Sequence, residues 1–103
     1  MAFNIQTVAN TNAVEVAYNF NNYSSMTFVN THATAEVTID LFIRNAAGTI
    51  VAYFLNNVKI PNGVSLKLDQ DEFAFDNLLY TLFIDSDNAS GAIDIVSRRK
   101  NDN

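Results

Sequence analysis

Hydrophobic and polar residues alternate along most of this chain, and a period of two predicts half-buried β-strands. The clearest case spans residues 35–44, where every second position from Val37 to Ile43 is aliphatic. The intervening positions are polar, with Phe42 as the single exception. The same alternation marks three further segments, at 64–69, 80–85 and 92–97.

The first half of the chain is less regular. Apolar residues at alternate positions predict short strands at Phe3–Thr7, Val14–Tyr18 and Met26–Phe28, with an Asn-rich aromatic loop at 19–25. Residues 49–55 are almost continuously apolar, which predicts a strand covered on both faces. The second cover could come from the domain itself or from another subunit.

Turn-forming residues fall between these segments. Asn45–Gly48 predicts a hairpin with Gly48 in a left-handed conformation, and Pro61-Asn62-Gly63 is a stronger turn signal. We expect Gly63 to have a positive φ and this turn to fix the register between the strand that ends at Ile60 and the strand at Val64–Asp69. Ser86–Gly91 is a third turn, and 71–79 could form one helical turn. About eight short strands at this spacing predict an all-β fold, a single antiparallel β-sandwich of the jelly-roll type.

Length and charge limit the possible organisation and partners. The 103 residues suit one domain, which we place at 1–97, followed by a short basic and polar tail at 98–103. The net charge is −5, and Arg98-Arg99-Lys100 is the one basic cluster. Proteins of this size that bind nucleic acid usually carry a basic face, so we expect no nucleic-acid partner.

The sequence also bears on the source of stability, on a signal peptide and on membrane association. It contains no cysteine, so stability must come from the core or from an oligomer. The first twelve residues lack the charged and apolar regions of a signal peptide. No apolar run approaches the roughly 18 residues of a membrane span, so we expect no membrane association.

Residues suited to catalysis are sparse. The single histidine, His32, sits in a polar Thr-rich segment without a nucleophile motif, which indicates a loop residue. Asp69, Asp71, Glu72 and Asp76 are close in sequence, but such clusters usually decorate exposed loops. We therefore expect that the protein is not an enzyme and has no cofactor.

Two ligand-binding alternatives remain open. Asp85–Gly91 places oxygen atoms at alternate positions, as calcium loops do, but lacks the glycine and glutamate that an EF-hand requires at its sixth and twelfth positions. We expect a hairpin turn without metal. Tyr18, Phe20 and Tyr23 could form a platform for sugars, but tryptophan is absent, which favours packing or an interface for these three.

A resemblance to a known group of proteins covers about 40 of the 103 residues. Ile60-Pro61-Asn62-Gly63-Val64-Ser65-Leu66-Lys67-Leu68 leads into Phe75-Asp76-Asn77-Leu78-Leu79-Tyr80-Thr81-Leu82, and a last strand contains Ile93-Asp94-Ile95-Val96. This order resembles that of small virion structural proteins of tailed bacteriophages. The resemblance implies capsid decoration (cement) or a head–tail junction role, and it implies no catalytic or ligand residue.

The resemblance leads to an expected mode of action in the virion. The protein would bind the major capsid protein or another virion protein as a homo-oligomer, with a trimer ahead of a dimer. Twelve aromatic side chains exceed what one small core can hide, so exposed ones are expected to serve as anchors. We expect Phe20, Tyr23, Tyr53 and Phe54 at such an interface. The alternatives are a neck, tail or fibre component, and a carbohydrate-binding module.

Overall fold

The structure is a computed structural model that describes residues 3–8, 12–16, 23–73, 75–76, 78–87 and 93–99. Eight strands account for most of these residues, as the alternating pattern predicts. Their bounds are β1 Phe3–Val8, β2 Val14–Glu15, β3 Tyr23–Asn30, β4 Val37–Arg44, β5 Ile50–Ile60, β6 Ser65–Asp69, β7 Thr81–Ser86 and β8 Ile93–Arg99.

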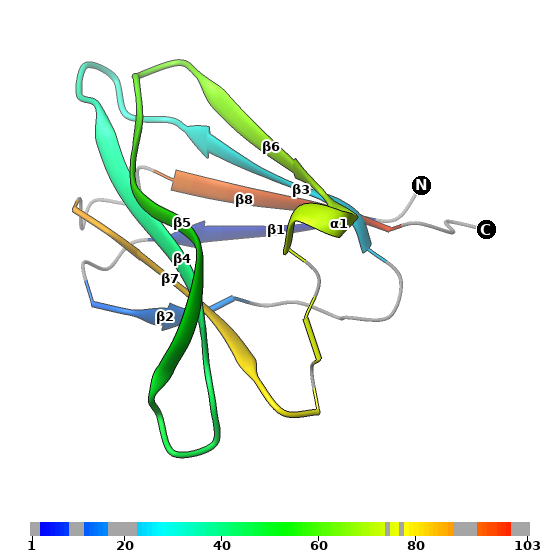
Figure 1. Ribbon diagram of the computed structural model, residues 1–103. Coiled ribbons are helices and arrows are strands. Elements are labelled where there is room, and N and C mark those ends of the chain that lie inside the picture. Colours follow the sequence, from blue (N-terminus) through cyan, green and yellow to red (C-terminus); the bar gives the residue numbers. More distant parts are fainter. Residues whose placement is uncertain are drawn as a thin grey trace.

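The strands form two four-stranded antiparallel sheets that face each other (Figure 1). The first sheet has the order β1-β8-β3-β6 and the second the order β2-β7-β4-β5. Consecutive strands therefore alternate between the sheets for most of the chain, which is the arrangement of an eight-stranded jelly roll. The prediction of an all-β sandwich with about eight strands is confirmed.

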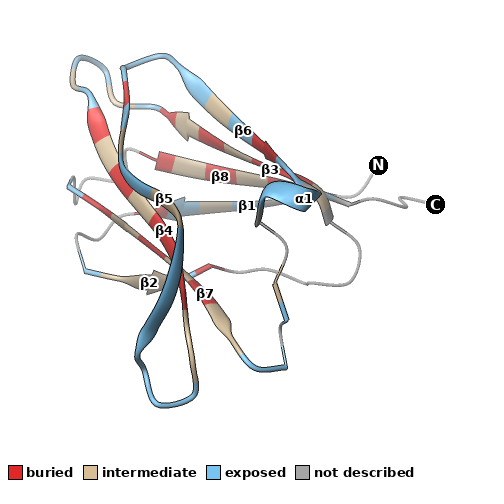
Figure 2. Ribbon diagram, viewed as in Figure 1, coloured by how far each residue is buried: buried red, intermediate tan, exposed pale blue. Residues whose placement is uncertain are grey.

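The core lies between the sheets and is built from the alternating aliphatic positions. Val37, Ile39, Leu41 and Ile43 of β4 are all buried, and they belong to one apolar cluster with Phe28 of β3 from the other sheet. Figure 2 shows buried positions on strands of both sheets. One cluster contains core residues of both sheets. The two layers are therefore held together mainly by apolar burial, the dominant favourable contribution to folding.

The first half of the long strand β5 is exposed to solvent. Ile50, Val51 and Tyr53 are exposed on it, because β5 is an edge strand of the second sheet (Figure 2). Its register with β4 shifts at three places, where β5 contributes an extra residue. A bulge reverses the alternation of faces. The continuous apolar run therefore reflects bulges, and within this chain it is not covered on both faces.

The hairpin between β4 and β5 forms as its turn residues predict. Gly48 has a φ of 85°, and its N–H donates to the carbonyl oxygen of Asn45 at 2.9 Å. The Oδ1 atom of Asn45 also accepts hydrogen bonds from the N–H groups of Ala47 and Thr49, both at 3.0 Å. The asparagine thus satisfies the backbone of the loop that it begins.

The Pro61-Asn62-Gly63 turn confirms one expectation and corrects another. Gly63 has a φ of 75°, as predicted for this turn. The turn does not set a register between β5 and β6, however, because it carries the chain from the second sheet to the first, where β6 pairs with β3. A turn signal identifies a change of direction but not which strands become neighbours.

The segment after β6 forms a single helical turn, α1, at Gln70–Phe73. The Oε1 atom of Glu72 accepts the N–H of Asp69 at 2.8 Å, so Glu72 caps the start of α1 in the manner of a capping box. At the C-terminus, β8 extends to Arg99. The first two residues of the expected tail are therefore part of the sheet. No helix in the described ranges is long and apolar enough to cross a membrane.

Candidate interaction surface

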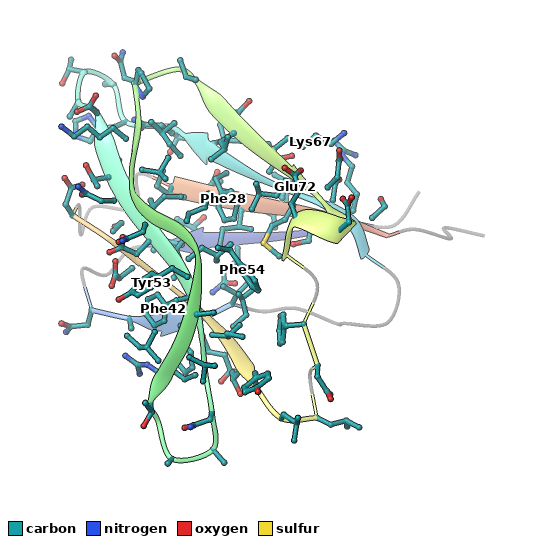
Figure 3. All side chains as sticks on the ribbon, in the orientation of Figure 1. Phe28, Phe42, Tyr53, Phe54, Lys67 and Glu72 are labelled. Carbon is teal, nitrogen blue, oxygen red and sulfur yellow. The ribbon has the colours of Figure 1, made fainter. Side chains whose placement is uncertain are left out.

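A row of aromatic side chains crosses the outer face of the second sheet. Register places Phe83 of β7 beside Phe42 of β4, and Phe42 beside Tyr53 of β5. The ring planes of Phe42 and Phe83 are nearly parallel, and their centroids are 6.1 Å apart. The centroids of Phe42 and Tyr53, two rings labelled in Figure 3, are 5.4 Å apart. Such distances are typical of favourable aromatic pairs. We call these three residues the aromatic row.

Arg44 covers part of the aromatic row. Its guanidinium carbon lies 4.6 Å from the ring centre of Phe83 and 5.3 Å from that of Phe42, within the range of cation–π contacts. Phe42 is consequently only 1% exposed although it faces away from the core. The Nε atom of Arg44 is buried and has no hydrogen-bond partner within the described part of the chain.

Two carboxyl groups lie on the opposite side of the aromatic row. Asp40 of β4 and Asp85 of β7 are direct partners in register, and their side chains are hydrogen-bonded. The pKa of Asp85 is raised from 3.8 to about 6 in total. Burial is the largest cause, the hydrogen bond and charge of Asp40 act in the same direction, and Arg44 opposes them. The Asp85 carboxyl therefore holds its proton to a higher pH than a free aspartate would.

The position of Asp40 is held by the backbone of the edge strand. Its Oδ1 atom accepts the N–H of Asn57 at 2.5 Å. Asn57 has a φ of 57°, a left-handed conformation that asparagine tolerates better than most residues. The bulge of β5 thereby turns a backbone donor towards the outer face and orients the Asp40 carboxylate.

A second exposed group of residues lies at one end of the same sheet. Ile50 and Val51 on β5 and Leu78 and Leu79 before β7 are all exposed, Leu78 to 89%. They share an end of the sheet because Arg44 pairs with Ile50 on one side and with Thr81 on the other. Figure 1 shows the β4–β5 hairpin and the start of β7 projecting at this end. We call these four residues the apolar end.

Of the four residues predicted to form an interface, one is exposed in the aromatic row, one packs against the core, and two have side chains outside the described part. Tyr53 is 48% exposed in the aromatic row. Phe54, one residue further, packs against the core and contacts Phe75 with a centroid distance of 6.2 Å. Tyr23 begins β3, but its side chain lies outside the described part. Phe20 also lies outside the described residues, as does Tyr18 of the possible sugar platform.

The candidate catalytic residues have structural contacts. The Nδ1 atom of His32 accepts hydrogen bonds from the N–H groups of Thr34 and Ala35, so it orders the loop between β3 and β4. Glu72 caps α1, and the Oδ1 atom of Asp76 accepts the N–H of Leu78. Asp69, Asp71, Glu72 and Asp76 are all exposed. None of these contacts assembles a nucleophile, a base and an orienting group.

The possible calcium loop is only partly described, because residues 88–92 lie outside the described ranges. Asp85 is the penultimate residue of β7 and faces Asp40. The Oδ1 atom of Asp87 accepts the N–H of Thr38 at 3.0 Å. Within the described ranges there is no group of three metal-ligating side chains and no pocket.

Sequence reasoning did not identify the charged residues that flank Phe42 on the outer face, Arg44, Asp40 and Asp85. One signal was present: Phe42 interrupts the polar face of its strand between Asp40 and Arg44. An aromatic residue at such a position indicates that the outer face is covered by something. Which strand lies alongside β4 could not be read from the sequence.

Comparisons with protein-family models, with curated proteins and with solved structures find no match to this chain. The geometry of the aromatic row and of the apolar end is therefore the basis for a function.

Proposed function

We propose that this protein is a structural component of a phage virion that binds the outer surface of the capsid and reinforces the shell. The observation that carries the proposal is the apolar end, where four exposed aliphatic side chains project at one end of the jelly roll. Exposed apolar groups gathered on one part of a surface mark sites of protein–protein contact. The motif resemblance described above agrees with this role, in which the protein works by binding.

The mechanism would be burial of apolar surface across joints between capsid subunits. Leu78 and Leu79 are held outward by the turn after Asp76, whose carbonyl oxygen accepts the N–H groups of Leu79 and Tyr80. Each large aliphatic side chain that becomes fully buried contributes roughly 1.5–3 kcal/mol. Repetition over a shell, with each copy contacting its neighbours, makes many modest contacts act together.

The test is to bind the purified protein to emptied capsids and to count its copies in purified virions by mass spectrometry. The double variant Leu78→Asp/Leu79→Asp should lose capsid binding. Ile5→Asp is the matched control, since Ile5 is an exposed aliphatic residue on the other sheet. Hundreds of copies per particle support decoration, about six or twelve support a neck or tail component, and absence from virions rejects the proposal.

A carbohydrate-binding role is the second candidate, and one observation favours it. Tyr53 presents an exposed aromatic ring beside the polar groups of Asp40 and Arg44, which is the combination that sugar sites use. Titration against a glycan panel would test this role. Binding that is lost in Tyr53→Ala and kept in Leu78→Asp would place carbohydrate binding ahead of capsid decoration.

A further inference from the structure

The charges on the outer face of the second sheet are divided by the aromatic row. Along β4, Asp40, Phe42 and Arg44 are separated by two residues each, a rise of about 7 Å per step. The carboxyls of Asp40 and Asp85 therefore lie on one side of the row, and Arg44 extends from the other side with its guanidinium over Phe42 and Phe83. A face with this division is complementary to itself when it is turned end for end.

We propose that two copies of this chain pair through this face, related by a two-fold axis that runs along the aromatic row. An axis in the plane of the interface brings the two sheets face to face and reverses the strand direction of one copy. Arg44 of each copy then faces Asp40 of the other, with Asp85 diagonally adjacent, and the exposed Tyr53 rings of the two copies lie opposite each other. Such an isologous contact is the commonest form of association between identical subunits.

The composition of the face agrees with an interface between proteins. Phenylalanine, tyrosine and arginine are the types enriched in the centres of interfaces, while lysine is depleted. Lys59 is the one lysine of the second sheet's described strands, and it lies near the opposite end of β5 from the apolar end. Sheets of this kind pack about 10 Å apart, a distance that aromatic and arginine side chains fill.

The pairing also gives a role to the arrangement of Arg44. Cation–π contacts with Phe42 and Phe83 hold the guanidinium in place, so it loses less freedom when a carboxylate approaches. Glu15 is the unfavourable element, because it lies beside Phe83 at the β2 end of the row and would face its own copy. It is exposed at the rim, where solvent screens the repulsion.

Charge reversal tests the arrangement. The purified wild-type chain should sediment as a dimer at tens of micromolar. Arg44→Glu and Asp40→Lys should each weaken dimerisation about tenfold or more, because each places like charges opposite one another. An equimolar mixture of the two variants should form a heterodimer, and the double variant Asp40→Lys/Arg44→Glu should dimerise again. Lys67→Glu, an exposed reversal on the other sheet, is the control and should remain dimeric.

Asp40 also accepts the N–H of Asn57, so circular dichroism must first establish that each variant is folded. Between folded variants, only complementary faces can produce the heterodimer. If Asp40→Lys is unfolded, the sedimentation of Arg44→Glu alone carries the test. A monomeric or trimeric wild type, or single variants that dimerise as well as wild type, would overturn the inference. The inference does not rest on the proposed function: a dimer that is absent from virions would reject capsid decoration and leave the pairing intact.

Discussion

Asp85 is the residue through which pH should act on the stability of this protein. Its pKa in the fold is raised from 3.8 to about 6, first by burial and then by Asp40. A carboxyl with a raised folded pKa stabilises the fold while it is protonated. This contribution is complete below about pH 4 and is lost as the pH rises through about 6.

Replacing Asp85 by asparagine should therefore change stability in only part of the pH range. Asp85→Asn retains a hydrogen-bond donor towards Asp40 and removes the ionisation. We expect a higher Tm than wild type at pH values above 6 and an equal Tm near pH 4, measured by thermal circular dichroism. Asp71→Asn, at an exposed position of α1, should follow wild type throughout. A lower Tm for Asp85→Asn above pH 6 would contradict this account.

Asn30 is the buried polar residue that joins the two sheets near the β5–β6 turn. Its Nδ2 atom donates to the carbonyl oxygens of Ile60 at 2.7 Å and Ala35 at 3.0 Å, and its Oδ1 accepts the N–H of His32. Asn30→Ala leaves these buried groups without partners and should lower the free energy of unfolding by about 1–3 kcal/mol, measured by urea denaturation. Asn62→Ala removes a long exposed bond and should change it by less than about 0.5 kcal/mol.

We expect the turn between β5 and β6 to require Gly63 because of its backbone conformation. Gly63 has a positive φ, and a side chain built at this position would meet no other atom. Any cost of substitution thus comes from the backbone. We expect Gly63→Val to lower the free energy of unfolding by about 1–2 kcal/mol, and Gly63→Asn to lower it less. Equal losses for the two variants would show that crowding, not conformation, sets the cost.

The segment that follows β7 should form its turn without a metal ion. The carboxyl of Asp85 faces Asp40, and the carboxylate of Asp87 already accepts the backbone of Thr38. Calorimetric titration with calcium should therefore show no binding tighter than about millimolar, the weak end of natural calcium modules. A micromolar heat signal that disappears in the Asp85→Ala/Asp87→Ala variant would reverse this prediction.

The whole molecule should unfold as one unit, because a single apolar cluster includes residues of both sheets. Ile95→Ala in β8 removes a side chain that is 1% exposed and should cost about 2–5 kcal/mol. The loss should accelerate amide hydrogen exchange in β4 of the other sheet as much as in β8. Unchanged protection of β4 amides would instead mean that the sheets open separately.

Local patterns in the chain were sufficient for the strands, most turns and the fold class. Alternation at Val37–Ile43 and the conformations of Gly48 and Gly63 depend on neighbours within a few residues, so they are readable without the fold. The absence of cysteine and the net charge of −5 are also read directly from the sequence. These features limit the protein to a small antiparallel sandwich whose stability depends on apolar burial.

Pairing between distant strands was decided only when the chain folded. The contact of Asp40 with Asp85 joins strands that are far apart in the sequence. The bulges of β5 and the crossover at Pro61 depend on which strands β5 and β6 pair with. A period of two does not reveal which strands become neighbours, because every half-buried strand carries the same alternation. The aromatic row consists of such cross-strand contacts, and Arg44 contacts Phe83 only after β4 and β7 have paired.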